Sequence, residues 1–132
     1  MIKSGTAYRL TGGVHTTVLC DQEQILAIGE DIGRHNTLDK VIGKSLMGDI
    51  HTKDKILLTT GRIASEILRK AVKLEVPIVV SLSSPTDEAV SLARNLGVSL
   101  IGYVRGKNMT VYANAQRLED RYETAHRYIA KG

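Results

Sequence analysis

Three short aliphatic runs, separated by segments with helical periodicity, are the feature that most restricts how this sequence can fold. The runs span residues 55–60, 78–82 and 98–104, and the second has the apolar character of a central parallel strand. Between them, apolar residues recur at helical spacing over about 63–74 and 89–96. Strands that alternate with helices predict right-handed βαβ crossovers and a parallel sheet with helices on both faces.

Additional strands flank this centre and make the predicted sheet mixed. Residues 14–20 are rich in β-branched side chains, and residues 24–29 return after a two-residue turn at 21–22, which predicts a hairpin. A helix is expected over about 35–47, and a last short strand over 109–113. The predicted order is β-β-α-β-α-β-α-β-β. The predicted fold class is therefore α/β, a three-layer α/β/α sandwich around a mixed sheet.

Proline, serine and glycine mark the ends of the predicted helices. Pro77 ends the second helix, because its ring cannot continue a helical turn. Ser84 is expected to cap the third helix, with Pro85 at the first helical position. Gly97 is expected to close the same helix as a C-cap.

Length, composition and charge restrict the class of protein. The 132 residues suffice for one domain with a real core, expected over 1–113, followed by a charged helix or tail over 114–132. Without Phe or Trp, and with five Tyr, the core must be aliphatic, and the stacking aromatics of an RNA-binding sheet are missing. The net charge of +4 favours an anionic ligand or an acidic partner and does not single out nucleic acid.

The single cysteine and the absence of long apolar runs indicate a cytoplasmic protein without membrane association. Cys20 cannot form an internal disulfide, and no CxxC pair exists to hold zinc, which fits a reducing compartment. No apolar run reaches the ~20 residues of a membrane span, and the amino terminus lacks a signal-peptide core. We expect Cys20 to be a small, partly buried thiol rather than a nucleophile.

The densest group of polar residues lies where the hairpin leads into the first helix. Residues 30–40 contain two acids followed by Arg34, His35 and Asn36. Free N–H groups at a helix start attract anions, a guanidinium suits phosphate, and an imidazole can donate a hydrogen bond. The alternative is structural: Asn36 caps the helix, Asp31 pairs with Arg34, and His35 has no functional role. The group is denser than capping requires, which favours a binding site.

Later junctions add residues to the same predicted edge, because ligands of α/β proteins bind where parallel strands end. Gly61, Arg62 and Ser65 follow the first parallel strand, Ser83 follows the second, and a turn with two cations and a glycine at 103–108 follows the third. Each has a simpler alternative: a glycine that only permits a turn, a serine that caps a helix, or a solvated hairpin turn. For a lone histidine such as His15 near a strand, a structural role is the simpler alternative.

Taken together, these motifs resemble those of the FdhD family, the formate dehydrogenase accessory sulfurtransferases. The resemblance runs from about residue 11 to about residue 113 in order and spacing. Its most specific piece is Gly33-Arg34-His35-Asn36 with Asp39-Lys40 after it. The other pieces are Thr-Gly-Gly-Val-His at 11–15, Gly61-Arg62 with Ser65, and Tyr-Val-Arg-Gly at 103–106.

The resemblance implies a function in the maturation of formate dehydrogenases. Members accept sulfur from a cysteine desulfurase and pass it to the molybdenum (or tungsten) bis(molybdopterin guanine dinucleotide) cofactor of formate dehydrogenase. They bind the guanine nucleotide portion of that cofactor, commonly act as homodimers, and have a fold that resembles cytidine deaminases. The implied cofactor-binding residues are His15, Arg34, His35, Asn36, Gly61, Arg62, Ser65, Ser83, Tyr103, Val104, Arg105, Gly106, Lys107 and Asn108.

Physical roles can be assigned to most of these positions. The cations are expected to meet phosphates, the glycines to permit close approach of the backbone, and the serines to supply hydroxyls. The histidines and the asparagine at the helix start are expected to orient the ligand. The cations are Arg34, Arg62, Arg105 and Lys107, and the glycines are Gly61 and Gly106. The serines are Ser65 and Ser83, and the ligand-orienting residues are His15, His35 and Asn36.

Two departures limit what the resemblance implies. Deaminases of this fold hold zinc with a residue that matches His35 and with a PCxxC motif, where this sequence has Gly-Arg-Ile-Ala-Ser at 61–65. Two of the three ligands of a catalytic zinc are missing, so we expect neither zinc nor deamination. The family's persulfide cysteine lies in a CxxC-type motif upstream of the segment where this sequence begins, and Cys20 does not match it. No catalytic residue is therefore assigned.

The missing cysteine leaves the function of this chain open between two alternatives. One is cofactor binding in support of sulfuration, and the other is a non-catalytic nucleotide-binding or docking module. A truncated chain and a naturally short family member are both compatible with the sequence. An unrelated α/β nucleotide-binding enzyme would need a catalytic residue set, which the sequence does not show.

Overall fold

The computed structural model describes residues 14–106 and 108–115, and every structural statement below refers to these residues. Strands and helices follow one another in the predicted order. The elements are β1 (His15–Cys20), β2 (Ile25–Asp31), α2 (Arg34–Met47), β3 (Ile56–Thr59), α3 (Ser65–Lys73), β4 (Ile78–Ser81), α4 (Asp87–Leu96), β5 (Ser99–Arg105) and β6 (Asn108–Ala113).

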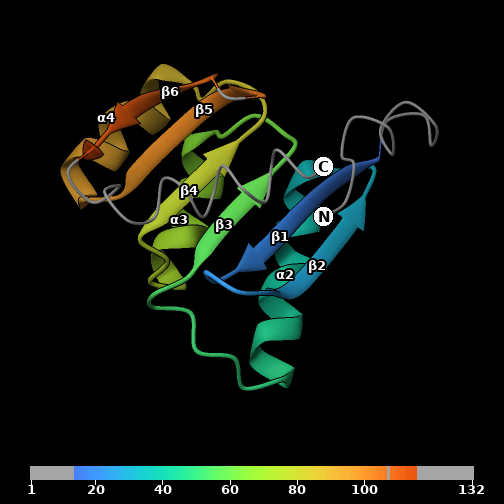
Figure 1. The fold of residues 1–132 in the computed structure, drawn as a ribbon. Coiled ribbons are helices and arrows are strands. Elements are labelled where there is room, and N and C mark those ends of the chain that lie inside the picture. The colour runs from blue at the N-terminus through green and yellow to red at the C-terminus, as the bar shows by residue number, and fades with distance from the viewer. Residues whose placement is uncertain (1–13, 107, 116–132) are drawn as a thin grey trace.

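The strands form one mixed sheet in the order β2-β1-β3-β4-β5-β6 (Figure 1). Strands β3, β4 and β5 are parallel, whereas β1 is antiparallel to both β2 and β3, and β6 is antiparallel to β5. The predicted α/β class with a mixed sheet is confirmed. The ends of β2, β3, β4 and β5 and the start of β1 therefore share one side of the sheet, which we call the carboxyl edge.

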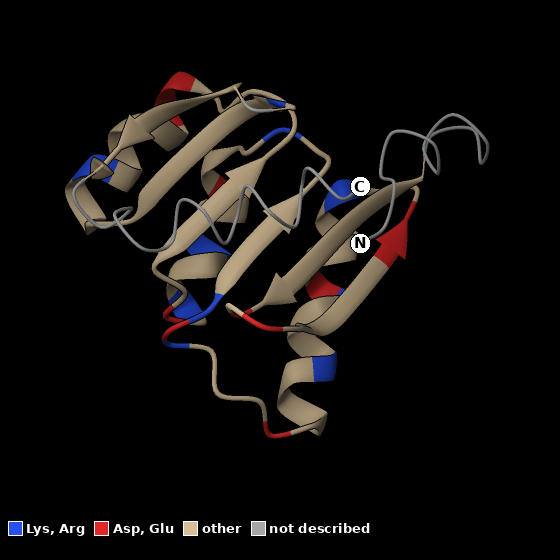
Figure 2. Ribbon diagram, viewed as in Figure 1, with Lys and Arg blue, Asp and Glu red and all other residues tan. Residues whose placement is uncertain are grey.

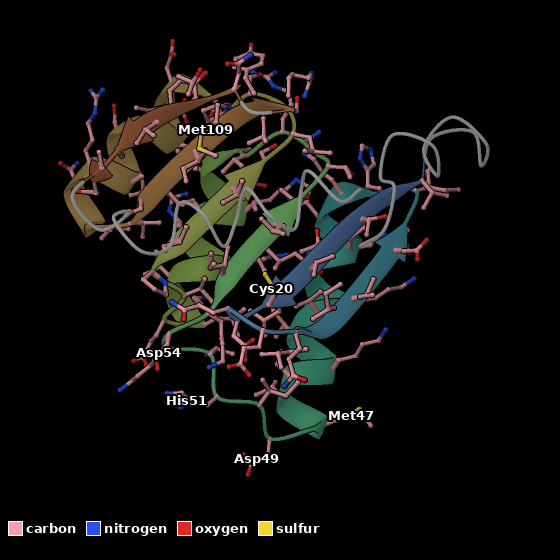
Figure 3. The ribbon with its side chains drawn as sticks, in the orientation of Figure 1. Cys20, Met47, Asp49, His51, Asp54 and Met109 are labelled. Atoms are coloured by element: carbon pink, nitrogen blue, oxygen red, sulfur yellow. The ribbon has the colours of Figure 1, made fainter. Side chains whose placement is uncertain are left out.

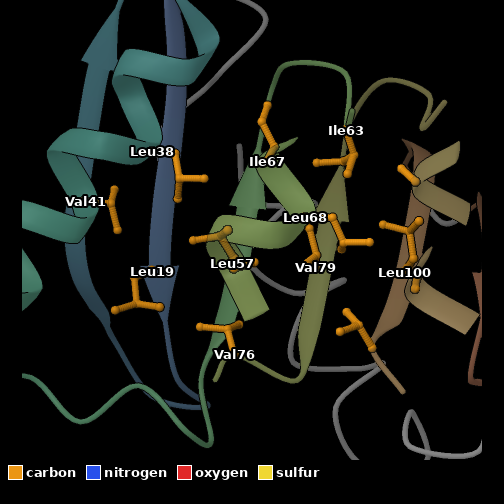
Figure 4. Close-up of a cluster of buried hydrophobic side chains, with 14 of the residues drawn as sticks. Leu19, Leu38, Val41, Leu57, Ile63, Ile67, Leu68, Val76, Val79 and Leu100 are labelled. Carbon is orange, nitrogen blue, oxygen red and sulfur yellow. The ribbon is translucent and has the colours of Figure 1, made fainter. Parts of the chain in front are cut away.

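Two aliphatic clusters form the core, one on each face of the sheet. The first includes inward-facing residues of all three described helices and the strand residues beneath them (Figure 4). The second contains Val18, Cys20, Leu58 and Val80 among its buried members, all of them from strands. The described helices thus pack on one face. The helix or tail expected over 114–132 lies outside the described residues, apart from positions 114 and 115.

A glycine in β2 allows the first turn of α2 to approach the sheet closely. A Cβ atom on Gly29 would lie 2.2 Å from the Thr37 carbonyl oxygen, which is far inside van der Waals contact. Leu38 and Val41 are fully buried against the sheet as a result. The close contact fixes where the amino terminus of α2, and therefore Arg34, meets the carboxyl edge.

Two local predictions were wrong. The hairpin loop has four residues rather than two, since Cys20 pairs with Ile25, and the Asp21 carboxylate accepts the N–H groups of Glu23 and Gln24 at 2.8 Å each. A residue in a loop whose carboxylate binds nearby N–H groups in this way makes an Asx-type turn. This turn replaces the tighter two-residue connection.

The second wrong prediction concerns the start of α4. Its N-cap is Thr86, whose hydroxyl accepts the Ala89 N–H at 3.1 Å, and not Ser84. Pro85 forms an isolated bridge with Ile63 and so lies outside the helix. Gly97 closes α4 with a φ of 75°, as predicted. None of the helices in the described ranges is both long enough and apolar enough to cross a membrane.

Candidate functional site

The carboxyl edge brings together most of the polar residues that the sequence singled out. Figure 2 shows the charged residues on helices, turns and strand ends, while the strand interiors are almost free of charge. Each parallel strand ends at this edge and leads into a loop before the next element. The loops after β3, β4 and β5 are therefore neighbours, as expected for the ligand side of an α/β sheet.

Arg34, His15 and Gly61 meet where the start of α2 passes the end of β3. A Cβ atom on Gly61 would lie 3.0 Å from the Arg34 Cβ and 3.5 Å from the His15 Nδ1. The side chain of Arg34 thus runs across the face of Gly61, which only a glycine leaves open. The N-cap of α2, Gly33, provides no side-chain cap, and the first turn carries no acidic residue. The acidic group at this helix start comes from β2 instead, because the Asp31 carboxylate accepts the Gly33 N–H at 3.0 Å.

Asp31 is engaged by groups other than Arg34. Its carboxylate accepts the Gly33 N–H at 3.0 Å and the Asn36 side-chain amide at 3.3 Å, and it forms an ion pair with Lys40 at 3.0 Å. The backbone N–H of Gly33, and then Lys40 and Asn36, lower the Asp31 pKa to about 2. The structural alternative, in which Asp31 pairs with Arg34 and Asn36 caps the helix, is wrong.

The Arg34 guanidinium has no acidic partner within the described ranges. Its Nε atom is buried and finds no hydrogen-bond acceptor among those residues. A buried donor without an acceptor costs about 1–3 kcal/mol, and more when the group is charged. An anion that reaches this atom would remove that cost.

Arg62 and Arg105 both reach the loop that follows β4. The Arg62 Nε donates to the Ser84 hydroxyl at 3.2 Å. The Arg105 guanidinium donates to the Leu82 carbonyl oxygen and, at 2.9 Å, to the Val104 carbonyl oxygen. These bonds hold both arginines at the carboxyl edge. They do not neutralise the positive charge of either guanidinium, because hydroxyl and carbonyl acceptors are neutral.

Ion pairs engage only part of the described cations, and one of these pairs, Lys40 with Asp31, lies at the carboxyl edge itself. Lys40, Lys53 and Lys70 each lie within 4 Å of a carboxylate, at 3.0, 3.5 and 2.8 Å respectively. Among the described ion pairs, none involves Arg34, Arg62 or Arg105. The carboxyl edge thus carries three guanidinium groups whose charge is not compensated by described residues.

Ser81 links the loop after β3 to the loop after β4, which in turn binds the backbone of β5. Its hydroxyl donates to the Gly61 carbonyl oxygen at 2.6 Å and accepts the Ser83 N–H at 2.9 Å. The Ser83 carbonyl oxygen in turn accepts the Tyr103 N–H at 2.9 Å. Three predicted site residues are therefore linked through one buried serine that the sequence did not single out.

Tyr103 has a backbone conformation that residues other than glycine rarely adopt. Its φ is 52°, and the residue is 49% exposed, two positions before Arg105 along the chain. Non-glycine residues in this region store backbone strain, and such strain is concentrated at functional sites. Gly106, three residues later, also has a left-handed φ of 58°, which a glycine adopts at no steric cost.

Several predicted residues point elsewhere. His35 lies 3.9 Å from Glu66 on α3, and Asn36 is bound to Asp31. Val104 is only 2% exposed and belongs to the second core cluster, so it can offer a ligand only its backbone.

The remaining predicted residues lie around the edge. Ser65 begins α3 and lines an open groove between α3 and α4, together with Arg69 and Asp87. Asn108 is exposed at the start of β6, and Lys107 lies outside the described residues.

Cys20 lies inside the sheet, away from the carboxyl edge (Figure 3). It is fully buried, and burial together with the nearby Asp21 raises the pKa of its thiol to about 12. A thiol with this pKa is almost entirely protonated near neutral pH and is a poor nucleophile. His51, in the loop before β3, lies at the opposite edge, and no group of three or more His, Cys, Asp or Glu residues able to hold a metal exists within 14–106 and 108–115.

Comparison with known proteins gives a consistent result. A sequence model of the FdhD/NarQ family matches residues 1–119. The chain is 46% identical over 113 residues to "Sulfur carrier protein FdhD" of Bacillus pumilus. The aligned residues make up 86% of this chain and 43% of that protein. It is 44% identical over 117 residues to the protein of the same name from Bacillus subtilis, covering 89% and 44%. The chain therefore spans less than half the length of these curated relatives.

Solved structures support the same fold. A formate dehydrogenase accessory protein from Desulfotalea psychrophila superposes with a TM-score of 0.77 at 32% identity, over 83% of this chain and 47% of that one. A dCMP deaminase from cyanophage S-TIM5 superposes with a TM-score of 0.56 at 16% identity, over 67% of this chain and 79% of that one. The predicted likeness to the deaminase fold is confirmed.

Proposed function

The chain belongs to the FdhD/NarQ family, and from this premise we propose that it takes part in the maturation of a formate dehydrogenase. Its part is to bind the guanine nucleotide portion of a molybdenum (or tungsten) bis(molybdopterin guanine dinucleotide) cofactor at the carboxyl edge of the sheet. When bound, that cofactor supplies the metal centre to be sulfurated. The residues described here supply phosphate contacts and a surface for the base.

The observation that carries this proposal is the set of uncompensated arginines at the carboxyl edge. The buried Arg34 Nε lacks an acceptor, and neither Arg62 nor Arg105 takes part in a described ion pair. A partly desolvated cation is stabilised when an anion is provided in fixed geometry, and a guanidinium binds phosphate oxygens through two parallel N–H groups. A nucleoside diphosphate provides such oxygens in a row.

Each of the other edge residues has a role that its geometry allows. Gly61 has no side chain to separate a phosphate from Arg34. The N–H groups in the first turn of α2, whose N-cap residue provides no side-chain cap, add a favourable field for the same anion. The exposed ring of Tyr103, held in place by the strained backbone, offers a flat face on which a guanine can stack.

The sulfur-carrying step of the family is not assigned to Cys20. The sequence contains this cysteine alone, and its thiol is buried with a raised pKa. We therefore propose that the chain holds the cofactor while a thiol from outside these 132 residues delivers sulfur. The alternative, a non-catalytic module for nucleotide binding or docking, is favoured by the same observation.

Further features of the proposal rest on family membership. We propose a cysteine desulfurase as the sulfur source, formate dehydrogenase as the client, a homodimer as the working form, and the cytoplasm as the place of action. The absence of a second cysteine in the sequence is compatible with that reducing compartment.

Isothermal titration calorimetry with GDP tests the proposal. We expect saturable binding, weakened by about 10- to 100-fold in Arg34→Ala and in Arg105→Ala, because a charge-assisted hydrogen bond contributes about 1.5–3 kcal/mol. Arg94→Ala is the matched control, since it removes the same charge from the exposed last turn of α4. Absence of binding at millimolar GDP, or equal loss in all three variants, would contradict a site at the carboxyl edge.

A further inference from the structure

Three buried threonines lie beneath the candidate site, one on each of the elements that meet there. Thr17 of β1, Thr37 of α2 and Thr59 of β3 are 2%, 0% and 6% exposed. Their neighbours along the strands, Val18 and Leu58, belong to the aliphatic core. Valine has nearly the same shape as threonine, so packing alone does not require a hydroxyl at any of these positions.

The hydroxyls of these residues, which we call the threonine cluster, bind one another. Thr17 Oγ1 lies 2.6 Å from Thr37 Oγ1 and donates to Thr59 Oγ1 at 3.2 Å. Thr37 Oγ1 also donates to the Arg34 carbonyl oxygen at 2.6 Å. Because the Thr37 proton is engaged there, its oxygen serves as an acceptor for Thr17, whose proton is shared between its two neighbours.

The two ends of the threonine cluster are residues of the candidate site. One end is the Arg34 carbonyl oxygen, and the other is the Gly61 N–H, which donates to Thr59 Oγ1 at 3.2 Å. The Arg34 side chain also lies beside Gly61, since a Cβ built on Gly61 would be only 3.0 Å from the Arg34 Cβ. The hydrogen bonds therefore connect two neighbouring residues of the candidate site through the core.

We propose that the threonine cluster consists of positioning residues, which fix the start of α2 relative to the end of β3 and so hold Arg34 over Gly61 for the anion. Buried polar networks of this kind rigidify and specify one geometry when all their members are satisfied. A binding constellation gains affinity when its supporting shell holds it before the ligand arrives. This inference rests on the proposed function, because it assigns the anion site to Arg34.

Thr37→Val and Thr37→Ser form the decisive pair of variants. Valine keeps the shape and removes the hydroxyl, while serine keeps the hydroxyl and loses a methyl group. We expect Thr37→Val to bind GDP about five- to tenfold more weakly, because one internal hydrogen bond contributes a factor of that order. Thr37→Ser should stay within about twofold of the wild type, because it keeps the hydroxyl that reaches Arg34.

A control separates positioning from general destabilisation. Ser45 is 3% exposed, and its hydroxyl donates to the Val41 carbonyl oxygen at 2.8 Å, about two turns beyond Thr37 along α2. Ser45→Ala removes a buried hydroxyl bond from the same helix without touching the carboxyl edge. It should lower the melting temperature and leave the GDP affinity unchanged.

A ligand-free readout makes the inference independent of GDP. Hydrogen exchange of the Gly61 amide and of the Arg34 Nε–H, followed by NMR, should be faster in Thr37→Val than in Thr37→Ser. If the wild type does not bind GDP, the proposed function fails and the exchange rates alone decide on the cluster. Equal exchange in the two variants, or GDP affinity in Thr37→Val equal to that of the wild type, would overturn the inference.

Discussion

Gly61→Ala probes the contact between Arg34 and the end of β3 with a single methyl group. The new Cβ would lie 3.0 Å from the Arg34 Cβ, 3.2 Å from the Arg34 Cδ and 3.5 Å from the His15 Nδ1. The first two distances are shorter than ordinary van der Waals contact, and both involve the stem of the arginine rather than its mobile end. The guanidinium must therefore move away from the glycine.

The size of the effect follows from two opposing contributions. Overpacking by one methyl group in a filled site costs about 1–3 kcal/mol. Replacing glycine by alanine where the backbone is not in the left-handed region recovers about 0.4–1 kcal/mol by restricting the unfolded chain. We expect a net loss of about 1–2 kcal/mol in the free energy of unfolding. For a domain of this size that corresponds to a decrease in Tm of about 4–8 °C.

The effect on ligand affinity should be larger than the effect on stability alone suggests. Displacement of the Arg34 guanidinium disturbs its bonds to phosphate, so we expect GDP binding to weaken by about tenfold. Thermal unfolding and titration calorimetry on the same samples measure both quantities. Gly43→Ala is the matched control, because a Cβ there meets nothing within 4 Å inside α2, and it should raise stability by about 0.5–1 kcal/mol without changing affinity.

One pair of results would refute this reasoning. If Gly61→Ala were as stable as the wild type and bound GDP equally well, Arg34 could not lie against Gly61 in the protein. If Gly43→Ala reduced GDP affinity to the same extent, the loss would reflect a general response to alanine rather than the contact at the carboxyl edge.

Two further predictions concern ionisable groups. Because the Asp31 pKa is lowered in the folded protein from 3.8 to about 2, its stabilising contribution is present above about pH 4 and is lost as the pH falls from 3.8 towards 2. Acid unfolding, monitored by circular dichroism, should show that stability depends less on pH in this range in Asp31→Asn than in the wild type. Identical profiles of the two proteins would argue against the contacts of Asp31 with Gly33, Lys40 and Asn36. Because Cys20 is buried and its pKa is raised to about 12, iodoacetamide at pH 8 should modify it only after unfolding in guanidinium, and rapid labelling of the folded chain would show that the thiol is accessible.

The order of the elements, and the gathering of polar residues at one edge of the sheet, could be predicted from local patterns. Aliphatic runs alternating with helical periodicity require parallel strands, and parallel strands end at one edge. Every residue placed directly after such a strand was therefore bound to lie near the others. This is why Gly61, Arg62, Ser83 and Arg105 were correctly expected to gather at one edge.

Choices among competing partners could not be predicted in this way. Asp31 had both Arg34 and Lys40 within reach along the chain, and the helical turn places Lys40 at the carboxylate. Ser84 had the composition of an N-cap, yet the bridge between Ile63 and Pro85 moves the start of α4 to Thr86. The ion-pair partner of Asp31 and the N-cap residue of α4 both depend on distances that are fixed only when the elements pack together.

The amino-acid sequence by itself determined the α/β class, the sequence of strands and helices and the arginines at the strand ends, because these follow from periodicity and from residue types in contiguous segments. Only the tertiary structure decided that Arg34 lacks a described acidic partner, that Cys20 is fully rather than partly buried, and that Thr17, Thr37 and Thr59 join beneath the site. Thr37 and Thr59 follow Thr17 by 20 and 42 residues along the chain. Contacts of that range leave no local pattern, since they exist only after the sheet and α2 have packed together.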